Sequence, residues 1–157
     1  MFVSLDLETT GFNSETDQII EFGAIKFDLK GNSETLQFLC NPGFKIPDIV
    51  VHITKIKDDH VKDANPFSKH LQEVQDFIGD LPIVGHNIKF DTDFLELNGV
   101  EIKNKLYDTH DLDAILLPNM ASYSLEILSE VFQLQHTDKH RALDDAIAAM
   151  ELFLKLI

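Results

Sequence analysis

The stretch FVSLDLETTG, residues 2–11, sets two acidic side chains into a segment that is otherwise largely apolar. The run from Phe2 to Leu7 predicts a short buried strand, and the Thr-Thr-Gly after it predicts a tight loop. Asp6 and Glu8 are two positions apart, so both side chains project from the same face of the strand. Like charges at the end of a buried strand are costly unless a cation neutralises them. An isolated Asp-x-Glu is common, however, so a cation site here needs support from other carboxylates.

The rest of the N-terminal third predicts a hairpin beside this first strand. Residues 18–28 and 34–40 both have strand-like patterns, and a Gly-Asn pair at positions 31 and 32 supplies the turn. We therefore expect three antiparallel strands before the Asn-Pro-Gly break at residues 41–43.

The remaining two thirds of the chain predicts helices that alternate with short strands. We expect strands over residues 81–85 and 106–107, short helices within 52–63, and helices over 66–79, 90–98, 111–117, 124–132 and 139–157. This order predicts an α/β fold with a mixed five-stranded sheet, three antiparallel N-terminal strands followed by parallel ones, flanked by helices. We expect residues 1–157 to form a single domain, either a subunit or a piece of a longer polypeptide.

The composition is globular and strongly acidic. Of the 157 residues 44% are apolar, and 13 basic residues against 27 acidic ones give a formal net charge of −14. This balance excludes a broad basic surface for duplex nucleic acid, so either the partner is not a polyanion or some carboxylates hold metal cations. We expect no signal peptide and no membrane anchor, and the single Cys40 suits a reducing cytoplasm.

Asp91 is a carboxylate on a helix face that should be buried. It shares that face with Phe94 and Leu95, its third and fourth neighbours, whereas Asp93 lies beside Glu96. Taken alone, Asp91 is better explained as an ordinary first-turn acid, which the helix dipole favours.

Asp145 stands out in the same way on the last helix. It aligns with Ala142 and Ala149, small residues that indicate close approach to another element, whereas Asp144 aligns with Glu151 on a solvated face. The apolar stripe of this helix is expected along Leu143, Ala146, Ile147, Met150, Phe153 and Leu154. His140 is five residues before Asp145 and does not share its face, so it must reach any common site from the helix entrance.

Three motifs built on these residues resemble those of the DEDDh exonucleases, the DnaQ-like branch of the ribonuclease H-like fold. Residues 6–11 (DLETTG) match Asp-x-Glu-Thr-Thr-Gly, residues 86–91 (HNIKFD) match His-Asn-x-x-Phe-Asp, and residues 140–146 (HRALDDA) match His-x-Ala-x-x-Asp-Ala. The similarity runs from residue 2 to about residue 153. It extends to the epsilon proofreading subunit of bacterial replicative polymerases and to exonuclease domains fused to polymerases and helicases.

The resemblance implies a 3′–5′ exonuclease that releases nucleoside 5′-monophosphates from single-stranded DNA ends with two divalent cations, Mg²⁺ or Mn²⁺. Asp6 would bridge both cations, Glu8 and Asp145 would complete the water-activating site, and Asp91 would serve the second cation. His140 would be the general base, a role that suits histidine because an imidazole ordinarily titrates near neutral pH.

The resemblance also implies substrate contacts at Leu7, Thr9, Thr10, Gly11, Phe12, His86, Asn87 and Phe90. The backbone of Leu7 and Thr9 would fix the 3′ end, and Phe12 and Phe90 are candidates to stack on bases. For both phenylalanines the sequence favours a simple core role over stacking. Residues 51–56 (VHITKI) lack the glycine common at this point in the family, which puts the shape of the substrate groove in doubt.

Two alternative functions remain open at this point. One is an RNA-trimming exonuclease similar to oligoribonuclease or ribonuclease T, which would be distinguished by contacts to the 2′-OH. The other is a catalytically silent family member that acts as a binding module. The expected partner is a single-stranded 3′ end in replication proofreading or repair. A polymerase or helicase subunit or fused domain would supply the basic surface that this chain lacks.

Overall fold

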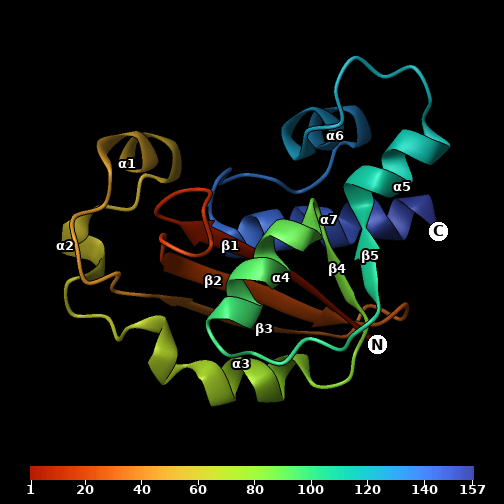
Figure 1. The fold of residues 1–157 in the computed structure, drawn as a ribbon. Coiled ribbons are helices and arrows are strands. Elements are labelled where there is room, and N and C mark those ends of the chain that lie inside the picture. Colours follow the sequence, from red (N-terminus) through yellow and green to blue (C-terminus); the bar gives the residue numbers. More distant parts are fainter.

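The computed structural model describes all 157 residues around a five-stranded sheet in the order β3-β2-β1-β4-β5 (Figure 1). β1 (Phe2–Thr9) pairs antiparallel with β2 (Ile19–Phe27), which pairs antiparallel with β3 (Ser33–Leu39). On the other side of β1, β4 (Ile83–Gly85) and β5 (Leu106–Asp108) run parallel to it. The predicted mixed sheet is confirmed.

Helices surround this sheet on both faces. They are α1 (Asp48–Thr54), α2 (Asp58–Val61), the 3₁₀ turn η1 (Phe67–Lys69), α3 (Leu71–Ile78), α4 (Ile88–Leu97), α5 (Thr109–Leu116), α6 (Leu125–Phe132) and α7 (Ala142–Leu156). No helix combines the length and the apolar character that a membrane crossing requires.

Several helix ends differ from the expected ones, and local backbone chemistry accounts for them. The helix expected over 66–79 is split at His70, whose φ of −105° and ψ of 1° interrupt the helical backbone between η1 and α3. α5 begins early because the side chain of Asp108 accepts a hydrogen bond from the His110 amide and caps the helix. α7 begins at residue 142, three residues later than expected, since His140 has a φ of 62°.

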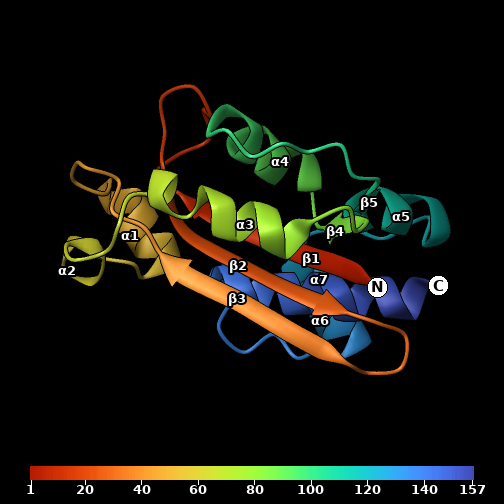
Figure 2. The same cartoon turned by 90° about the horizontal axis from the view of Figure 1, so that it is seen from below.

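β1 lies between two layers because its side chains alternate. Val3, Leu5 and Leu7 belong to the main hydrophobic cluster with residues of α3 and α4. On the opposite face Ser4 Oγ donates a hydrogen bond of 2.7 Å to the backbone carbonyl of Ala146 in α7. Figure 2 shows α3 and α7 on opposite sides of the sheet. The even-numbered positions of β1, Asp6 and Glu8 among them, therefore face α7.

α7 approaches the sheet more closely than its expected apolar stripe implies. Its buried residues are Ala142, Ala146, Ala148, Ala149, Leu152 and Phe153, whereas Leu154 is exposed, so the expected stripe is shifted. The cause is the small size of these alanines, together with Gly23 of β2. A Cβ on Gly23 would lie 2.2 Å from the backbone nitrogen of Leu143. Only glycine lets the helix begin against β2 at this point.

The segment that departs from the family pattern forms the end of α1. Lys55 ends this helix in the left-handed conformation, with a φ of 61°. Glycine is the usual residue at such a helix end. A lysine thus takes the backbone conformation that glycine favours, and the chain continues into Ile56, which is buried against Val50 and Ile46.

Candidate active site

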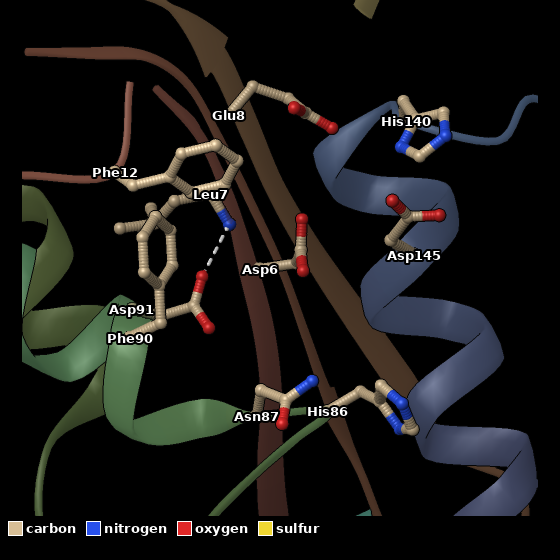
Figure 3. A pocket seen from close by; sticks show the side chains of 10 residues that line it. All are labelled: Asp6, Leu7, Glu8, Phe12, His86, Asn87, Phe90, Asp91, His140 and Asp145. Atoms are coloured by element: carbon tan, nitrogen blue, oxygen red, sulfur yellow. Dashed lines mark hydrogen bonds between the residues drawn. The ribbon is translucent and has the colours of Figure 1, made fainter. Parts of the chain in front are cut away.

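Side chains from three distant parts of the chain meet at the end of β1. One pocket is lined by Asp6, Leu7, Glu8, Phe12, His86, Asn87, Phe90, Asp91, His140 and Asp145 (Figure 3). All of these are residues that the sequence singled out. The other three expected contacts, Thr9, Thr10 and Gly11, line an adjoining groove that shares Leu7, Glu8, Phe12, Phe90 and His140 with the pocket.

Asp91 reaches the pocket from α4, on the far side of β1. It is only 3% exposed, and its Oδ1 accepts a hydrogen bond of 2.9 Å from the backbone amide of Leu7. Phe94 and Leu95 on the same helix face are buried, whereas Asp93 contacts Lys89 at the surface. The predicted difference between Asp91 and Asp93 is confirmed. The Leu7 amide is engaged with Asp91, so it fixes a carboxylate rather than standing free for a substrate.

Asp145 and His140 enter the pocket from the start of α7. Asp145 lies in the first turn, and its amide donates to the carbonyl of Arg141 at 3.0 Å. His140 precedes the helix and is exposed, in agreement with the prediction that it reaches the site from the helix entrance. Glu8, His140 and Asp145 each offer one ligand-type atom, and these three atoms lie within 4.8 Å of one another.

An ion pair that the sequence did not predict fixes this helix entrance. The carboxylate of Glu21 in β2 is fully buried and accepts hydrogen bonds from Arg141 Nε at 3.1 Å and Arg141 Nη2 at 2.7 Å. It also accepts one from the Ala142 amide at 3.1 Å. The two residues that follow His140 are therefore attached to the sheet. A signal was available in the sequence, because Glu21 interrupts an apolar strand just as Asp6 does.

A second unpredicted neighbour is His136, whose Nε2 contacts Oδ1 of Asp145. No pattern in the sequence marks this histidine. It lies outside the three motifs and on no regular element.

The carboxylates of the pocket have no lysine or arginine beside them in the lining, and the pKa values of three of them are raised. Burial raises the pKa of Asp6 well above its ordinary value, and the neighbouring Asp91 and Asp145 raise it further. Burial and Asp145 raise the pKa of Glu8 to about 8. Burial also raises the pKa of Asp91, in spite of the opposing hydrogen bond from Leu7. Each of these groups resists ionisation unless a positive charge is nearby.

The donor set fits hard divalent cations. No lysine or arginine lines the pocket, while four carboxylates, Asp6, Glu8, Asp91 and Asp145, do. Carboxylate oxygens are the ligands that Mg²⁺ and Mn²⁺ prefer. These four side chains are therefore the ones able to hold such cations.

Phe12 and Phe90 form an apolar wall beside the carboxylates. Phe12 is 91% exposed, so the alternative that it is a core residue is wrong. Phe90 is half-buried against the main hydrophobic cluster, with its ring centroid 5.0 Å from that of Phe94 and 6.2 Å from that of Phe12. The groove continues over Ile49 and Ile53, which are also exposed.

The loop after β1 holds Phe12 in this place. Thr9 Oγ1 donates to the Gly11 carbonyl at 2.6 Å, and Thr10 Oγ1 donates to Asp17 Oδ1 at 3.1 Å. A Cβ on Gly11 would lie 2.4 Å from the Asp17 carboxylate, so any other residue here would displace that side chain. The hydroxyls of Thr9 and Thr10 therefore shape the loop.

His86 and Asn87 complete the opposite wall. His86 Nδ1 is 2.9 Å from the Thr109 hydroxyl, and burial lowers the pKa of its imidazole. Asn87 is exposed and has a left-handed backbone conformation, which asparagine tolerates. Its backbone amide donates a hydrogen bond of 3.0 Å to Asp108 Oδ1.

Comparison with known proteins gives one family for nearly the whole chain. The family described as Exonuclease matches residues 3–153. The DNA polymerase III subunit epsilon of Treponema pallidum is 36% identical over 163 residues, which cover 99% of this chain and 76% of that protein. The PolC-type DNA polymerase III of Caldanaerobacter subterraneus is 33% identical over 160 residues, or 99% of this chain. The chain spans only 11% of the length of that polymerase.

Solved structures share the architecture. Exonuclease X, in complex with 5′-overhanging duplex DNA, has a TM-score of 0.82 at 24% identity, covering 99% of this chain and 90% of that one. E. coli Exonuclease I, in complex with a dT13 oligonucleotide, has a TM-score of 0.79 at 21% identity, covering 98% of this chain and 40% of that one. The predicted ribonuclease H-like fold is confirmed by these likenesses.

The raised carboxyl pKa values predict that the metal-free protein loses stability as pH rises. A carboxyl group with a higher pKa in the folded state stabilises the fold fully below its unfolded pKa and loses that effect as pH passes its folded pKa. For Glu8 this interval runs from 4.5 to about 8, and Asp6 and Asp91 shift in the same direction. Calorimetry in EDTA should therefore give a melting temperature that falls between about pH 5 and pH 9.

The control for this prediction is a change at an exposed glutamate. Glu8→Gln should flatten the decline, whereas Glu34→Gln on the exposed part of β3 should leave it unchanged. Adding Mg²⁺ should raise the melting temperature most at the alkaline end. A melting temperature that rises with pH in EDTA would contradict the proposed cluster of unfavourable charges.

Proposed function

The chain belongs to the exonuclease family, as its motifs predict, and on that basis we propose that it removes nucleotides from the 3′ end of single-stranded DNA. The observation that carries this proposal is the convergence of Asp6, Glu8, Asp91, His140 and Asp145 on one pocket. The reaction is a hydrolysis of the terminal phosphodiester that releases a nucleoside 5′-monophosphate. We further propose that residues 1–157 act as one exonuclease domain.

Asp6, Glu8, Asp91 and Asp145 would hold two divalent cations, Mg²⁺ or Mn²⁺, and Asp6 would serve both. Such cations lower the pKa of the attacking water and offset the charge that develops on the attacking and leaving oxygens. Glu8 and Asp145 would serve the cation that activates water, and Asp91 would serve the second cation. The hydrogen bond of 2.9 Å from the Leu7 backbone amide holds the Asp91 carboxylate in the pocket.

His140 takes the proton from the attacking water. It is the exposed member of the three groups that lie within 4.8 Å of one another, so its ring can exchange this proton with solvent after each turnover. The left-handed backbone at His140 and the Arg141–Glu21 ion pair support its position at the pocket mouth. An ordinary histidine pKa is close to neutral, which suits a general base.

The apolar groove beside the carboxylates suits the terminal base. Phe12 and Phe90 present aromatic surface, and neither the pocket nor the groove has a lysine or arginine in its lining. Stacking holds single strands without many basic contacts. The net charge of −14 then predicts low processivity for this chain alone, and a polymerase or helicase partner would supply a basic surface.

The relatives favour DNA and a role in replication proofreading or repair. Those named above are DNA polymerase III proteins, and the two solved neighbours are described in complex with DNA. A reducing cytoplasm is the location that we propose, because the one cysteine, Cys40, is a buried free thiol.

The proposal predicts different effects for adjacent carboxylates of α7. Asp145→Asn should slow the digestion of a 5′-labelled single-stranded DNA oligomer at least ~100-fold, because it removes a charged ligand from the pocket. Asp144→Asn should keep most of the rate, because Asp144 lies outside the pocket and accepts a hydrogen bond from the Asp138 amide. Gel time courses with Mn²⁺, Mg²⁺ or EDTA measure the digestion rate of both variants.

Each outcome of this time course selects one function. A metal-dependent ladder that shortens from the 3′ end supports the exonuclease, and faster digestion of a matching RNA would identify an RNA-trimming enzyme instead. Absence of digestion for both substrates, with folded protein and bound metal, would contradict the proposal and favour a silent binding module.

The stacking role predicts a defect in substrate use without a defect in folding. Phe12→Ala should lower kcat/KM on single-stranded DNA about tenfold, since stacking of one base on an aromatic ring contributes roughly 1–3 kcal/mol. Its melting temperature should not change, because the side chain is 91% exposed. Leu29→Ala, at a position 68% exposed beyond the end of β2, is the matched control. Unchanged kcat/KM in Phe12→Ala would rule out the stacking role.

A further inference from the structure

His136 makes one polar contact through its side chain, and that contact is the carboxylate of Asp145. Its Nε2 contacts Asp145 Oδ1, and the His136 side chain is 4% exposed, against 13% for that of Asp145. We assign the hydrogen of this contact to Nε2, because a carboxylate oxygen is a hydrogen-bond acceptor. The other ring nitrogen, Nδ1, is buried and has no hydrogen-bond partner.

Packing alone is a poor explanation for a histidine at this place. A buried polar atom without a partner costs about 1–3 kcal/mol. Leucine or methionine would fill a similar volume without that penalty. The contact with Asp145 is the feature of His136 that an apolar side chain would not reproduce.

The segment that carries His136 is attached to α7 on both sides of the histidine. The backbone amide of Gln135 donates to Glu151 Oε2 at 2.8 Å, and the backbone amide of Asp138 donates to Asp144 Oδ2 at 2.9 Å. Both acceptors belong to the helix that carries Asp145. The position of the imidazole relative to Asp145 is therefore set by one rigid element.

The two histidines of this segment differ in what they contact. His140 is exposed and lines the pocket, whereas His136 is nearly buried, contacts Asp145 and does not line the pocket. His136 thus acts on the site only through the carboxylate that it contacts.

We propose that His136 is a positioning residue that holds Oδ1 of Asp145 and leaves Oδ2 for a divalent cation in the pocket. This inference rests on the proposed function, which makes Asp145 a metal ligand. Hydrogen-bond partners of ligating side chains typically change metal affinity 10–100-fold. Their effect comes from fixing the orientation of the ligand before the cation arrives.

The test is a calorimetric titration of the whole chain with Mn²⁺. His136→Leu should weaken Mn²⁺ binding about tenfold or more, because it removes the donor to Asp145. His136→Gln should restore most of the affinity, since the glutamine amide nitrogen can take the place of Nε2. Thr137→Val is the control, because the Thr137 hydroxyl faces Asp144 at 3.4 Å and not Asp145. If His136→Leu does not fold, His136→Asn replaces it as a polar side chain too short to reach the carboxylate.

The outcomes separate this inference from the proposed function. Equal Mn²⁺ affinity in the wild type and His136→Leu, with a lower melting temperature in the variant, would reduce His136 to a packing role and overturn the inference. Equal losses in His136→Leu and His136→Gln would also overturn it. A wild-type chain that binds Mn²⁺ in a His136-dependent way but leaves DNA intact would contradict the nuclease proposal alone.

Discussion

The close contact of α7 with β2 at Gly23 is the constraint on which the rest of the site depends. A side chain at Gly23 would collide with the backbone of α7, because its Cβ would lie 2.2 Å from the Leu143 nitrogen. With glycine there, α7 begins against the sheet, and Asp6, directly opposite Gly23 in β1, faces the first turn that carries Asp145. The buried pair between Arg141 and Glu21 then fixes the same helix end. Carboxylates from residues 6 and 145 meet because of this one contact.

The same contact creates an electrostatic problem that the protein must relieve. Burial and mutual repulsion raise the pKa values of Asp6 and Glu8, and no cationic side chain lines the pocket. Such a cluster is relieved either by protons or by cations. Stability and activity are therefore linked: the charges that destabilise the metal-free fold are those that the proposed chemistry requires. Bound cations would offset the acidic cluster locally, whereas the rest of the net charge of −14 still opposes binding of a polyanion.

Much of the fold and of the site could be predicted from local rules. The period of two placed Asp6 and Glu8 on one face of a strand, and helical periodicity separated Asp91 from Asp93 and Asp145 from Asp144. These rules concern residues close in the sequence. The Glu21–Arg141 pair and the contact of His136 with Asp145 depend on tertiary packing that no local period encodes. The exposure of Phe12 depends on a loop that is held by hydrogen bonds to the Asp17 carboxylate. The buried face of α7 depends on Gly23, which is more than a hundred positions away in the sequence.

In the proposed mechanism, the side chains of Asp6, Glu8, Asp91 and Asp145 together hold two divalent cations at the end of β1. The most direct test is an anomalous difference map from crystals grown with Mn²⁺ and a nucleoside 5′-monophosphate. We expect two Mn²⁺ peaks about 4 Å apart, with the Asp6 carboxylate in contact with both. A map without Mn²⁺ in this pocket, or with Mn²⁺ held only by residues elsewhere on the chain, would contradict it.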